Sequence, residues 1–142
     1  MEKQTTIKNK ITLKGKGLHT GKNVEVNILP AQANSGIVFK RIDLENPVLI
    51  KADAEAVTET SRGTTIEAKG AKVATIEHLM AALYASNIDN ALIEINGEEV
   101  PILDGSSKYW LEAIEKSRVE ELEKERKYFC LKEIVSYVDE EN

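Results

Sequence analysis

Two adjacent residues, Glu77 and His78, carry the side chains that a metal-dependent hydrolase requires. A neutral imidazole can hold a metal ion, and a nearby carboxylate can take a proton from the attacking water. The pair lies in the sequence Thr75-Ile76-Glu77-His78-Leu79, which we expect to open an amphipathic helix. The macrodipole at a helix N-terminus favours an ionised Glu77 and disfavours a protonated His78, so the imidazole would keep its metal-binding form.

Each candidate residue also has a structural explanation. Glu77 could simply complement the helix dipole, and His78 could be a core histidine with a satisfied ring. His19 lies in a glycine-rich stretch, 15–21, that an ordinary turn would explain, and Asp104 fits a turn and helix cap. The chain has two histidines, one cysteine and no His-Glu-x-x-His pattern, whereas a catalytic zinc usually takes three protein ligands. A metal site based on His78 must therefore be completed by residues elsewhere.

The composition is typical of one soluble, folded domain. The chain has 142 residues, of which 42% are hydrophobic and 30% charged. A net charge of −5 and scattered basic residues argue against a nucleic-acid binder. Cys130 is the one cysteine, which excludes an internal disulfide and favours a reducing, cytoplasmic compartment. No apolar run is long enough to span a membrane, and residues 1–15 lack the apolar core of a signal peptide.

Alternating apolar and polar residues predict the strands that would position these candidates. The alternation lies at 6–14 and 23–28, further strands are expected at 37–41 and 91–95, and shorter pieces lie between 48 and 74, with a turn at 68–70. The first two of these strands are expected to pair as a hairpin. Helical spacing predicts one helix from Thr75 and a second after an N-cap at Ser106 or Ser107. The apolar stripe of the second helix consists of Tyr109, Trp110, Ala113 and Ile114.

The last part of the chain indicates a domain boundary. Residues 115–127 are dominated by charge, which favours a solvated helix face or a linker. Strand character returns at 128–131 and 134–138, and the end of the chain, 139–142, is turn-like. We therefore expect one domain over residues 1–125 and the first strand of a truncated second domain over residues 126–142.

The first predicted helix is apolar on more than one side. One stripe consists of Ile76, Leu79, Met80 and Leu83, and alanines at 81, 82 and 85 occupy other sides. A helix of this kind is generally covered on more than one face. We expect a second domain or a partner chain to cover it, and the isolated chain to self-associate through Met80, Leu83 or their neighbours.

Three motifs, in order, resemble those of a single family. They are Gly15-Lys16-Gly17-Leu18-His19-Thr20-Gly21, Thr75-Ile76-Glu77-His78-Leu79 and Pro101-Ile102-Leu103-Asp104-Gly105-Ser106. The family is the UDP-3-O-acyl-N-acetylglucosamine deacetylases, zinc amidases of bacterial lipid A synthesis. The resemblance runs from about Thr5 to Val138 and corresponds to the amino-terminal half of the enzyme. One departure is Ser61-Arg62-Gly63, where some relatives carry apolar residues that rim the pocket.

The resemblance implies a fold and a role for each candidate. The fold is an α/β (α+β) two-layer sandwich of a mixed sheet with two main helices on one face, one half of a pseudo-symmetric two-domain enzyme. Glu77 matches the general base and His78 a ligand of the zinc cofactor, while His19 and Asp104 match supporting residues. The remaining ligands, a histidine and an aspartate, belong to the missing carboxy-terminal domain, so this chain alone is expected to be inactive.

The implied substrate is UDP-3-O-acyl-N-acetylglucosamine, whose acetamide is hydrolysed in the cytoplasm. In some bacteria this deacetylase is fused to a hydroxyacyl carrier-protein dehydratase. The alternative hypothesis is a non-catalytic α/β interaction domain in which Glu77 and His78 are structural.

Overall fold

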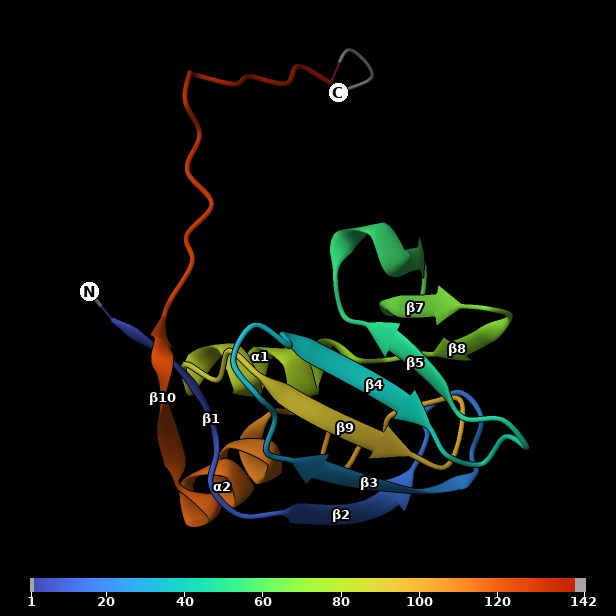
Figure 1. The fold of residues 1–142 in the computed structure, drawn as a ribbon. Helices are drawn as coiled ribbons and strands as arrows, with labels where there is room; N and C mark the ends of the chain where they lie inside the picture. The colour runs from blue at the N-terminus through green and yellow to red at the C-terminus, as the bar shows by residue number, and fades with distance from the viewer. Residues whose placement is uncertain (1, 140–142) are drawn as a thin grey trace.

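A mixed five-stranded β-sheet carries two helices on one face in the computed structural model, which describes residues 2–139 (Figure 1). In spatial order the strands are β2 (Ile11–Lys16), β3 (Asn23–Leu29), β9 (Ala91–Ile95), β4 (Ile37–Arg41) and β5 (Val48–Lys51). β4 and β9 run parallel, and the other neighbouring strands are antiparallel, including the expected β2–β3 hairpin. The predicted mixed α/β architecture is confirmed.

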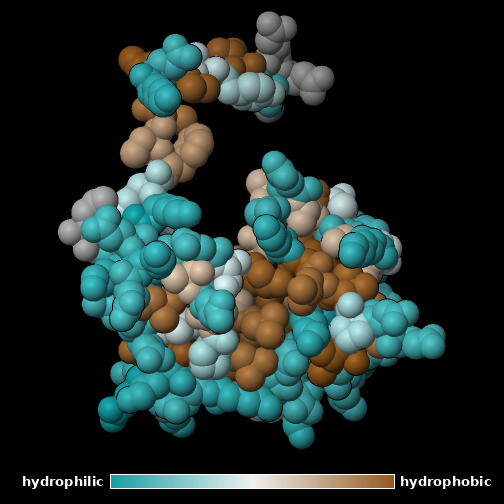
Figure 2. Space-filling model, in the orientation of Figure 1, coloured by the Kyte–Doolittle hydropathy of each residue, from teal (hydrophilic) through white to brown (hydrophobic). Residues whose placement is uncertain are grey.

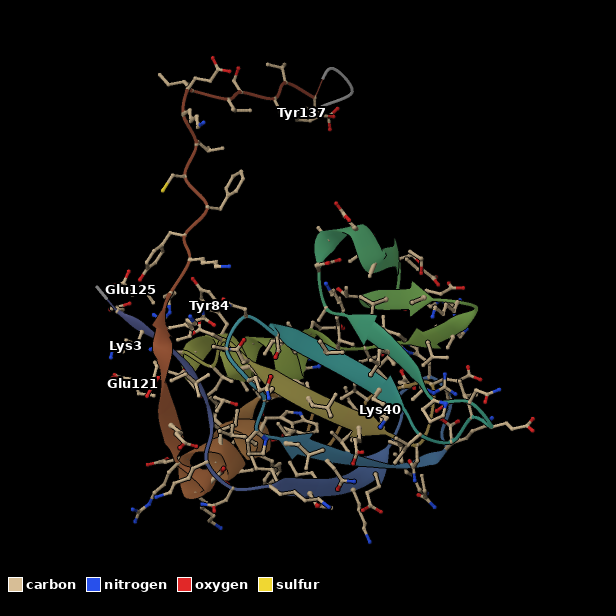
Figure 3. All side chains as sticks on the ribbon, in the orientation of Figure 1. Lys3, Lys40, Tyr84, Glu121, Glu125 and Tyr137 are labelled. Carbon is tan, nitrogen blue, oxygen red and sulfur yellow. The ribbon has the colours of Figure 1, made fainter. Side chains whose placement is uncertain are left out.

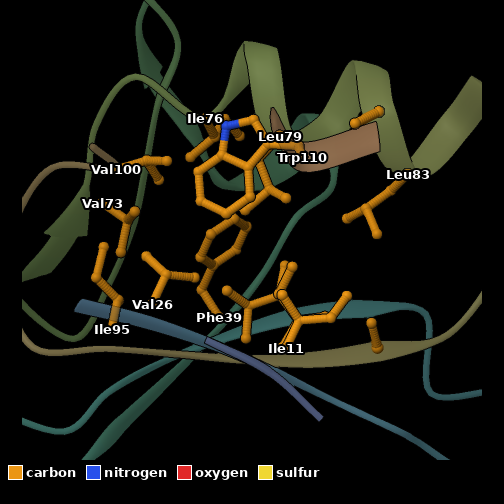
Figure 4. Close-up of a cluster of buried hydrophobic side chains, with 14 of the residues drawn as sticks. Ile11, Val26, Phe39, Val73, Ile76, Leu79, Leu83, Ile95, Val100 and Trp110 are labelled. Atoms are coloured by element: carbon orange, nitrogen blue, oxygen red, sulfur yellow. The ribbon is translucent and has the colours of Figure 1, made fainter. Parts of the chain in front are cut away.

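Helices α1 (Glu77–Ala85) and α2 (Lys108–Ser117) enclose the core against this sheet (Figure 4). Their buried side chains include Leu79, Leu83, Trp110 and Ile114, opposite sheet residues such as Phe39. Burial of each large apolar side chain stabilises the fold by roughly 1.5–3 kcal/mol, so the helices are firmly fixed to the sheet. α1 thus holds Glu77 and His78 at a defined edge of the core.

Two expectations about the helices are wrong in detail. Leu83 is only 1% exposed because it packs inside this domain, so it cannot mediate self-association. Tyr109, predicted to belong to the apolar stripe of α2, is 45% exposed, whereas Trp110 and Ile114 are buried and Ala113 packs against the core. Ser107 is the N-cap residue of α2 without a side-chain cap hydrogen bond, and the backbone N–H of Lys108 donates to Ser106 Oγ at 3.1 Å instead.

A smaller antiparallel sheet leads the chain to α1. It consists of β6 (Val57–Glu59), β7 (Thr65–Ala68) and β8 (Ala71–Val73), and a short 3₁₀ helix, η1 (Ala54–Ala56), precedes it. This confirms the short strands predicted between 48 and 74, as well as the turn at 68–70. After β8, Thr75 adopts a positive φ of 59°, which is uncommon for a residue with a branched side chain. The chain changes direction there and enters α1.

The strand predicted over residues 6–14 is divided between two sheets. β1 (Lys3–Ile7) lies outside the main sheet and pairs antiparallel with β10 (Val119–Glu125), so that Lys3 lies opposite Glu125 (Figure 3). The charged segment 115–127 is therefore not a helix face or a linker: α2 ends at Ser117, and a strand follows. Most β10 side chains are exposed, so backbone pairing with β1 is compatible with a charged sequence.

Residues 128–138 form no strand within the described part of the chain, contrary to the alternating pattern. They extend away from the body of the domain with their apolar side chains in solvent, among them Phe129 at 91% and Ile134 at 98% exposure (Figures 1 and 2). A strand needs a neighbour that completes its hydrogen bonds, and no described strand pairs with this segment. Of the turn-like end, residues 140–142 lie outside the described residues.

Candidate functional site

Glu77 is the first residue of α1, and the preceding loop holds its carboxylate. The backbone N–H of Thr64 donates to Glu77 Oε2 at 3.1 Å. Gly63 has a φ of 148°, and a Cβ built on it would lie 2.9 Å from Glu77 Oε1. A larger residue at position 63 would therefore press on the carboxylate.

His78 is half-buried, and its hydrogen bond to a side chain is made by its backbone and not by its ring. Its carbonyl oxygen accepts a hydrogen bond from Ser107 Oγ at 2.8 Å, which ties the start of α1 to the start of α2. Within residues 2–139, no hydrogen bond is made to the imidazole ring of His78. This differs from a core histidine with a satisfied ring, and it leaves both ring nitrogens free to take a ligand.

A glutamate that the sequence did not reveal, Glu99, forms the centre of the polar site. Its side chain is 1% exposed, and four donors surround it. Glu99 Oε1 accepts the backbone N–H groups of His19 at 2.9 Å and Thr20 at 3.0 Å. Glu99 Oε2 accepts Thr75 Oγ1 at 2.6 Å and lies 2.8 Å from His19 Nδ1. Glu99 thus joins the glycine-rich loop to the residues that start α1.

The environment of Glu99 keeps its carboxyl group ionised. Burial alone raises its pKa, but hydrogen bonds from Thr75, Thr20 and His19 outweigh burial and lower the pKa to about 2. A buried charge is tolerated only where several donors satisfy it. The carboxylate is therefore a fixed acceptor between the two loops at neutral pH.

Gly17 provides the one sequence signal for this arrangement. A Cβ on Gly17 would collide with Glu99 Oε1 and Thr20 Oγ1, so the loop can wrap around the carboxylate only with glycine here. The backbone also holds Glu99 in place, because Ala74 and Glu99 form a parallel β-bridge in which Val100 N donates to the carbonyl oxygen of Ala74 at 3.0 Å. The sequence showed that the stretch 15–21 needs glycines, but not that one of them faces a carboxylate far along the chain.

A pocket of about 490 Å³ opens beside this cluster. Its lining includes His19, Thr75, Glu99, Arg62 and Lys72. Glu77 and His78 are not among the lining residues, but Gly63 belongs to the lining and adjoins Glu77. The structure thus brings His19 and the start of α1 to one region through Glu99 and Thr75.

Asp104 lies apart from this pocket. It is exposed, and its Oδ1 accepts the backbone N–H of Ser106 at 3.0 Å and Ser106 Oγ at 2.8 Å. These two hydrogen bonds lower the pKa of Asp104. The residue shapes the turn before α2, whose N-cap, Ser107, is the residue that contacts His78.

The described residues contain no group of three or more His, Cys, Asp or Glu side chains arranged to hold a metal ion. Among them, no helix is long and apolar enough to cross a membrane. The candidate site of this chain consists of a carboxylate and an imidazole at the start of α1, linked to His19 through Thr75 and Glu99.

Fold and site define a two-layer α/β domain with its polar residues gathered where β8 enters α1. Residues 4–142 match the sequence model of the family described as LpxC, UDP-3-O-acyl N-acetylglycosamine deacetylase, and the chain belongs to this family.

Curated relatives have the same family names. A UDP-3-O-acyl-N-acetylglucosamine deacetylase of Geotalea uraniireducens is 49% identical over 96% of this chain and 44% of its own length. Bifunctional LpxC/FabZ enzymes of Bacteroides thetaiotaomicron and Porphyromonas gingivalis are 48% and 44% identical, over 99% and 100% of this chain but 30% and 31% of their own lengths. The chain thus spans less than half the length of these relatives.

Proposed function

We propose that this chain is the amino-terminal part of a zinc-dependent deacetylase. The whole enzyme would hydrolyse the acetamide of UDP-3-O-acyl-N-acetylglucosamine in lipid A biosynthesis, in the cytoplasm. Family membership supports the class of reaction. The observation that carries the proposal is the adjacency of Glu77 and His78 at the start of α1, with the ring of His78 free of hydrogen bonds within residues 2–139.

His78 suits a zinc ion as one ligand of several. A neutral imidazole is a common zinc ligand, and His78 is a half-buried residue whose ring makes no hydrogen bond within residues 2–139. The other ligands would come from a carboxy-terminal domain outside this chain. When bound, zinc would polarise the acetamide carbonyl and lower the pKa of a water molecule.

Glu77 is the proposed general base. The hydrogen bond from Thr64 fixes Oε2, and Oε1 makes no hydrogen bond to the described residues. Glu77 would take a proton from the water as its oxygen attacks the acetamide carbon. The C–N bond then breaks and the departing nitrogen takes a proton, which yields acetate and the free amine of glucosamine.

His19 and Asp104 are proposed as supporting residues, the first by direct contact with substrate and the second through the structure around His78. His19 lines the pocket and is 37% exposed, so it can contact substrate directly. Asp104 acts at a distance, because it holds the turn that places Ser107 against the backbone of His78.

Reconstitution with the carboxy-terminal part of the protein tests the proposal. We expect this chain alone to bind zinc weakly and to release no acetate from UDP-3-O-acyl-N-acetylglucosamine. Adding the second part should restore both tight zinc binding, measured by metal analysis after gel filtration, and acetate release. If the reconstituted protein binds no zinc and hydrolyses no acetamide, the alternative of a non-catalytic interaction domain replaces the proposal.

The isolated chain is also proposed to self-associate. Its exposed apolar side chains include Tyr84 on α1, which is 87% exposed, and those of the segment 128–138 (Figure 3). Met80, the other residue expected at this contact, is half-buried. Sedimentation velocity should show a dimer or larger species that dissociates when Tyr84→Ser and Phe129→Ser are introduced together. A monomer at all concentrations would contradict this proposal.

A further inference from the structure

Glu99 connects two parts of the candidate site that are far apart in sequence. Its Oε1 fixes the backbone of the glycine-rich loop at His19 and Thr20. Its Oε2 lies 2.8 Å from His19 Nδ1 and accepts Thr75 Oγ1 at 2.6 Å. Each carboxylate oxygen therefore receives two donors, and the side chain is 1% exposed. Glu99 also lines the pocket, but its four donors hold both carboxylate oxygens in place.

This arrangement determines which nitrogen of His19 carries a proton. An ionised carboxylate only accepts hydrogen bonds, so the 2.8 Å contact requires a proton on His19 Nδ1. In the neutral ring, Nε2 then has a free lone pair. No described residue makes a hydrogen bond to Nε2, and His19 lines the pocket of about 490 Å³. The ring thus presents an acceptor to whatever occupies the pocket.

The same carboxylate also stabilises an unusual backbone conformation before α1. Thr75 is 3% exposed and has a φ of 59°, a region that non-glycine residues seldom adopt. Its hydroxyl needs an acceptor in the buried site, and Glu99 provides one. Because Thr75 lies two residues before Glu77, its conformation sets the direction from which α1 begins.

We infer that Glu99 is a positioning residue of the proposed hydrolase site. Glu99 holds His19 with Nδ1 protonated and with Nε2 as an acceptor facing the pocket, and it also holds Thr75 at the start of α1. The group that Nε2 would recognise is a hydroxyl or N–H donor of the bound substrate. This consequence for turnover rests on the proposed function, whereas the state of the ring does not.

The test is a nitrogen-detected NMR spectrum of the imidazole rings at neutral pH. The chain has only two histidines, so each ring can be assigned by comparison with a His78→Ala variant. In the unmodified chain we expect His19 to show a protonated Nδ1 and a bare Nε2. A His19 ring that carries a proton on Nε2, with or without one on Nδ1, would overturn the inference.

Glu99→Gln is the decisive variant, because it keeps the shape of the side chain and can donate as well as accept. We expect the His19 signals to shift toward the other tautomer or a mixture of both. Glu98→Gln is the matched control, since it makes the same chemical change at the neighbouring, exposed residue and should leave His19 unchanged. A folded Glu99→Gln chain with an unchanged His19 ring would overturn the role of the carboxylate.

Thr75→Val tests the second half of the inference and does not depend on the stability of Glu99→Gln. Valine keeps the branched shape but cannot donate to Glu99. The His19 tautomer should persist, whereas the backbone amide signals of Glu77 and His78 should move. If those amide signals stay in place, Glu99 does not position α1. In the full-length protein, Glu99→Gln should raise KM more than it lowers kcat, and an inactive parent protein would contradict the proposed function without changing the ring result.

Discussion

The two histidines of this chain lie in opposite situations. His19 is held by a buried carboxylate at 2.8 Å, and the backbone of its loop is bound to the same group. His78 is held by its backbone alone, through Ser107, and its ring makes no hydrogen bond within residues 2–139. Within the described residues, the ring of His19 has a fixed hydrogen-bond partner, whereas the ring of His78 has none.

This difference shows which part of the site the domain builds by itself. A ring that must bind substrate benefits from a fixed tautomer, which a neighbouring carboxylate provides. A ring that serves as a metal ligand is oriented by the metal and by the other ligands. In the proposed enzyme, those other ligands lie outside this chain. The contrast leads to four predictions, from the largest expected effect to the smallest.

The start of α1, with Glu77 and His78, should be the part of the site most sensitive to mutation. In the full-length protein, Glu77→Ala should leave zinc bound but lower kcat by about 10² to 10⁴, the usual contribution of a general base. Metal analysis and acetate release measure the two effects separately. Glu67→Ala, on the exposed surface of β7, is the control and should retain activity. Ordinary turnover in Glu77→Ala would refute the assignment of the base.

Glu99, which holds His19, should make the free energy of unfolding depend on pH in the acid range. The pKa of Glu99 is about 2 in the folded chain, below its ordinary value of 4.5, so the unfolded chain takes up the proton first. Its contribution is thus fully present above pH 4.5 and is lost as the pH falls toward 2, by at most about 3 kcal/mol.

Urea unfolding between pH 7 and pH 2.5 measures this loss. The Glu99→Gln variant should be less stable at pH 7 and should show a flatter dependence on pH in the acid range. Equal acid dependence in both proteins would mean that Glu99 does not contribute in this way.

Gly63 offers a way to disturb Glu77 without changing it. Gly63→Ala places a methyl group 2.9 Å from Glu77 Oε1, at a φ of 148° that other residues rarely adopt. We expect a loss of about 2 kcal/mol in the free energy of unfolding, and lower turnover in the full-length protein.

A second glycine separates backbone strain from contact with the carboxylate. Gly36 also has a positive φ, of 69°, but a Cβ there would meet nothing within 4 Å. Gly36→Ala should therefore cost about 1 kcal/mol of stability and leave turnover unchanged. Equal losses of turnover in both variants would show that the contact with Glu77 is unimportant.

Asp104→Ala should have the smallest effect. The residue is exposed and reaches His78 only through the turn at Ser106 and the hydroxyl of Ser107. A slightly lower thermal midpoint and a modest decrease in turnover are expected, measured by calorimetry and acetate release. Loss of activity as large as that of Glu77→Ala would instead place Asp104 in direct contact with the reaction.

Much of the fold could be predicted from local patterns. Alternation located β3, apolar runs beside turns located β4 and β9, and helical spacing located α1 and α2, because each of these elements packs against a shared core. β10 could not be predicted, since Val119–Glu125 is nearly all exposed and owes its conformation to pairing with β1. Its charges indicated solvent exposure correctly but not the type of element.

The candidate site could be predicted only where residues are neighbours in sequence. Glu77 and His78 were found because they are adjacent at a helix start. Glu99 was not found, because its partners, His19 and Thr75, lie 80 and 24 positions away. Only the folded chain brings these groups around one carboxylate.

The pairing of β1 with β10 has a consequence during synthesis. Lys3 and Ile7 lie opposite Glu125 and Val119, so the first strand must wait for almost the whole domain to be translated before its ladder can form. At roughly 5–20 residues per second, this wait is on the order of ten seconds on the ribosome. Arg126 forms ion pairs with Glu2 and Asp89, and these would form only after Arg126 leaves the exit tunnel. The two ends of the domain are therefore joined only late in its synthesis.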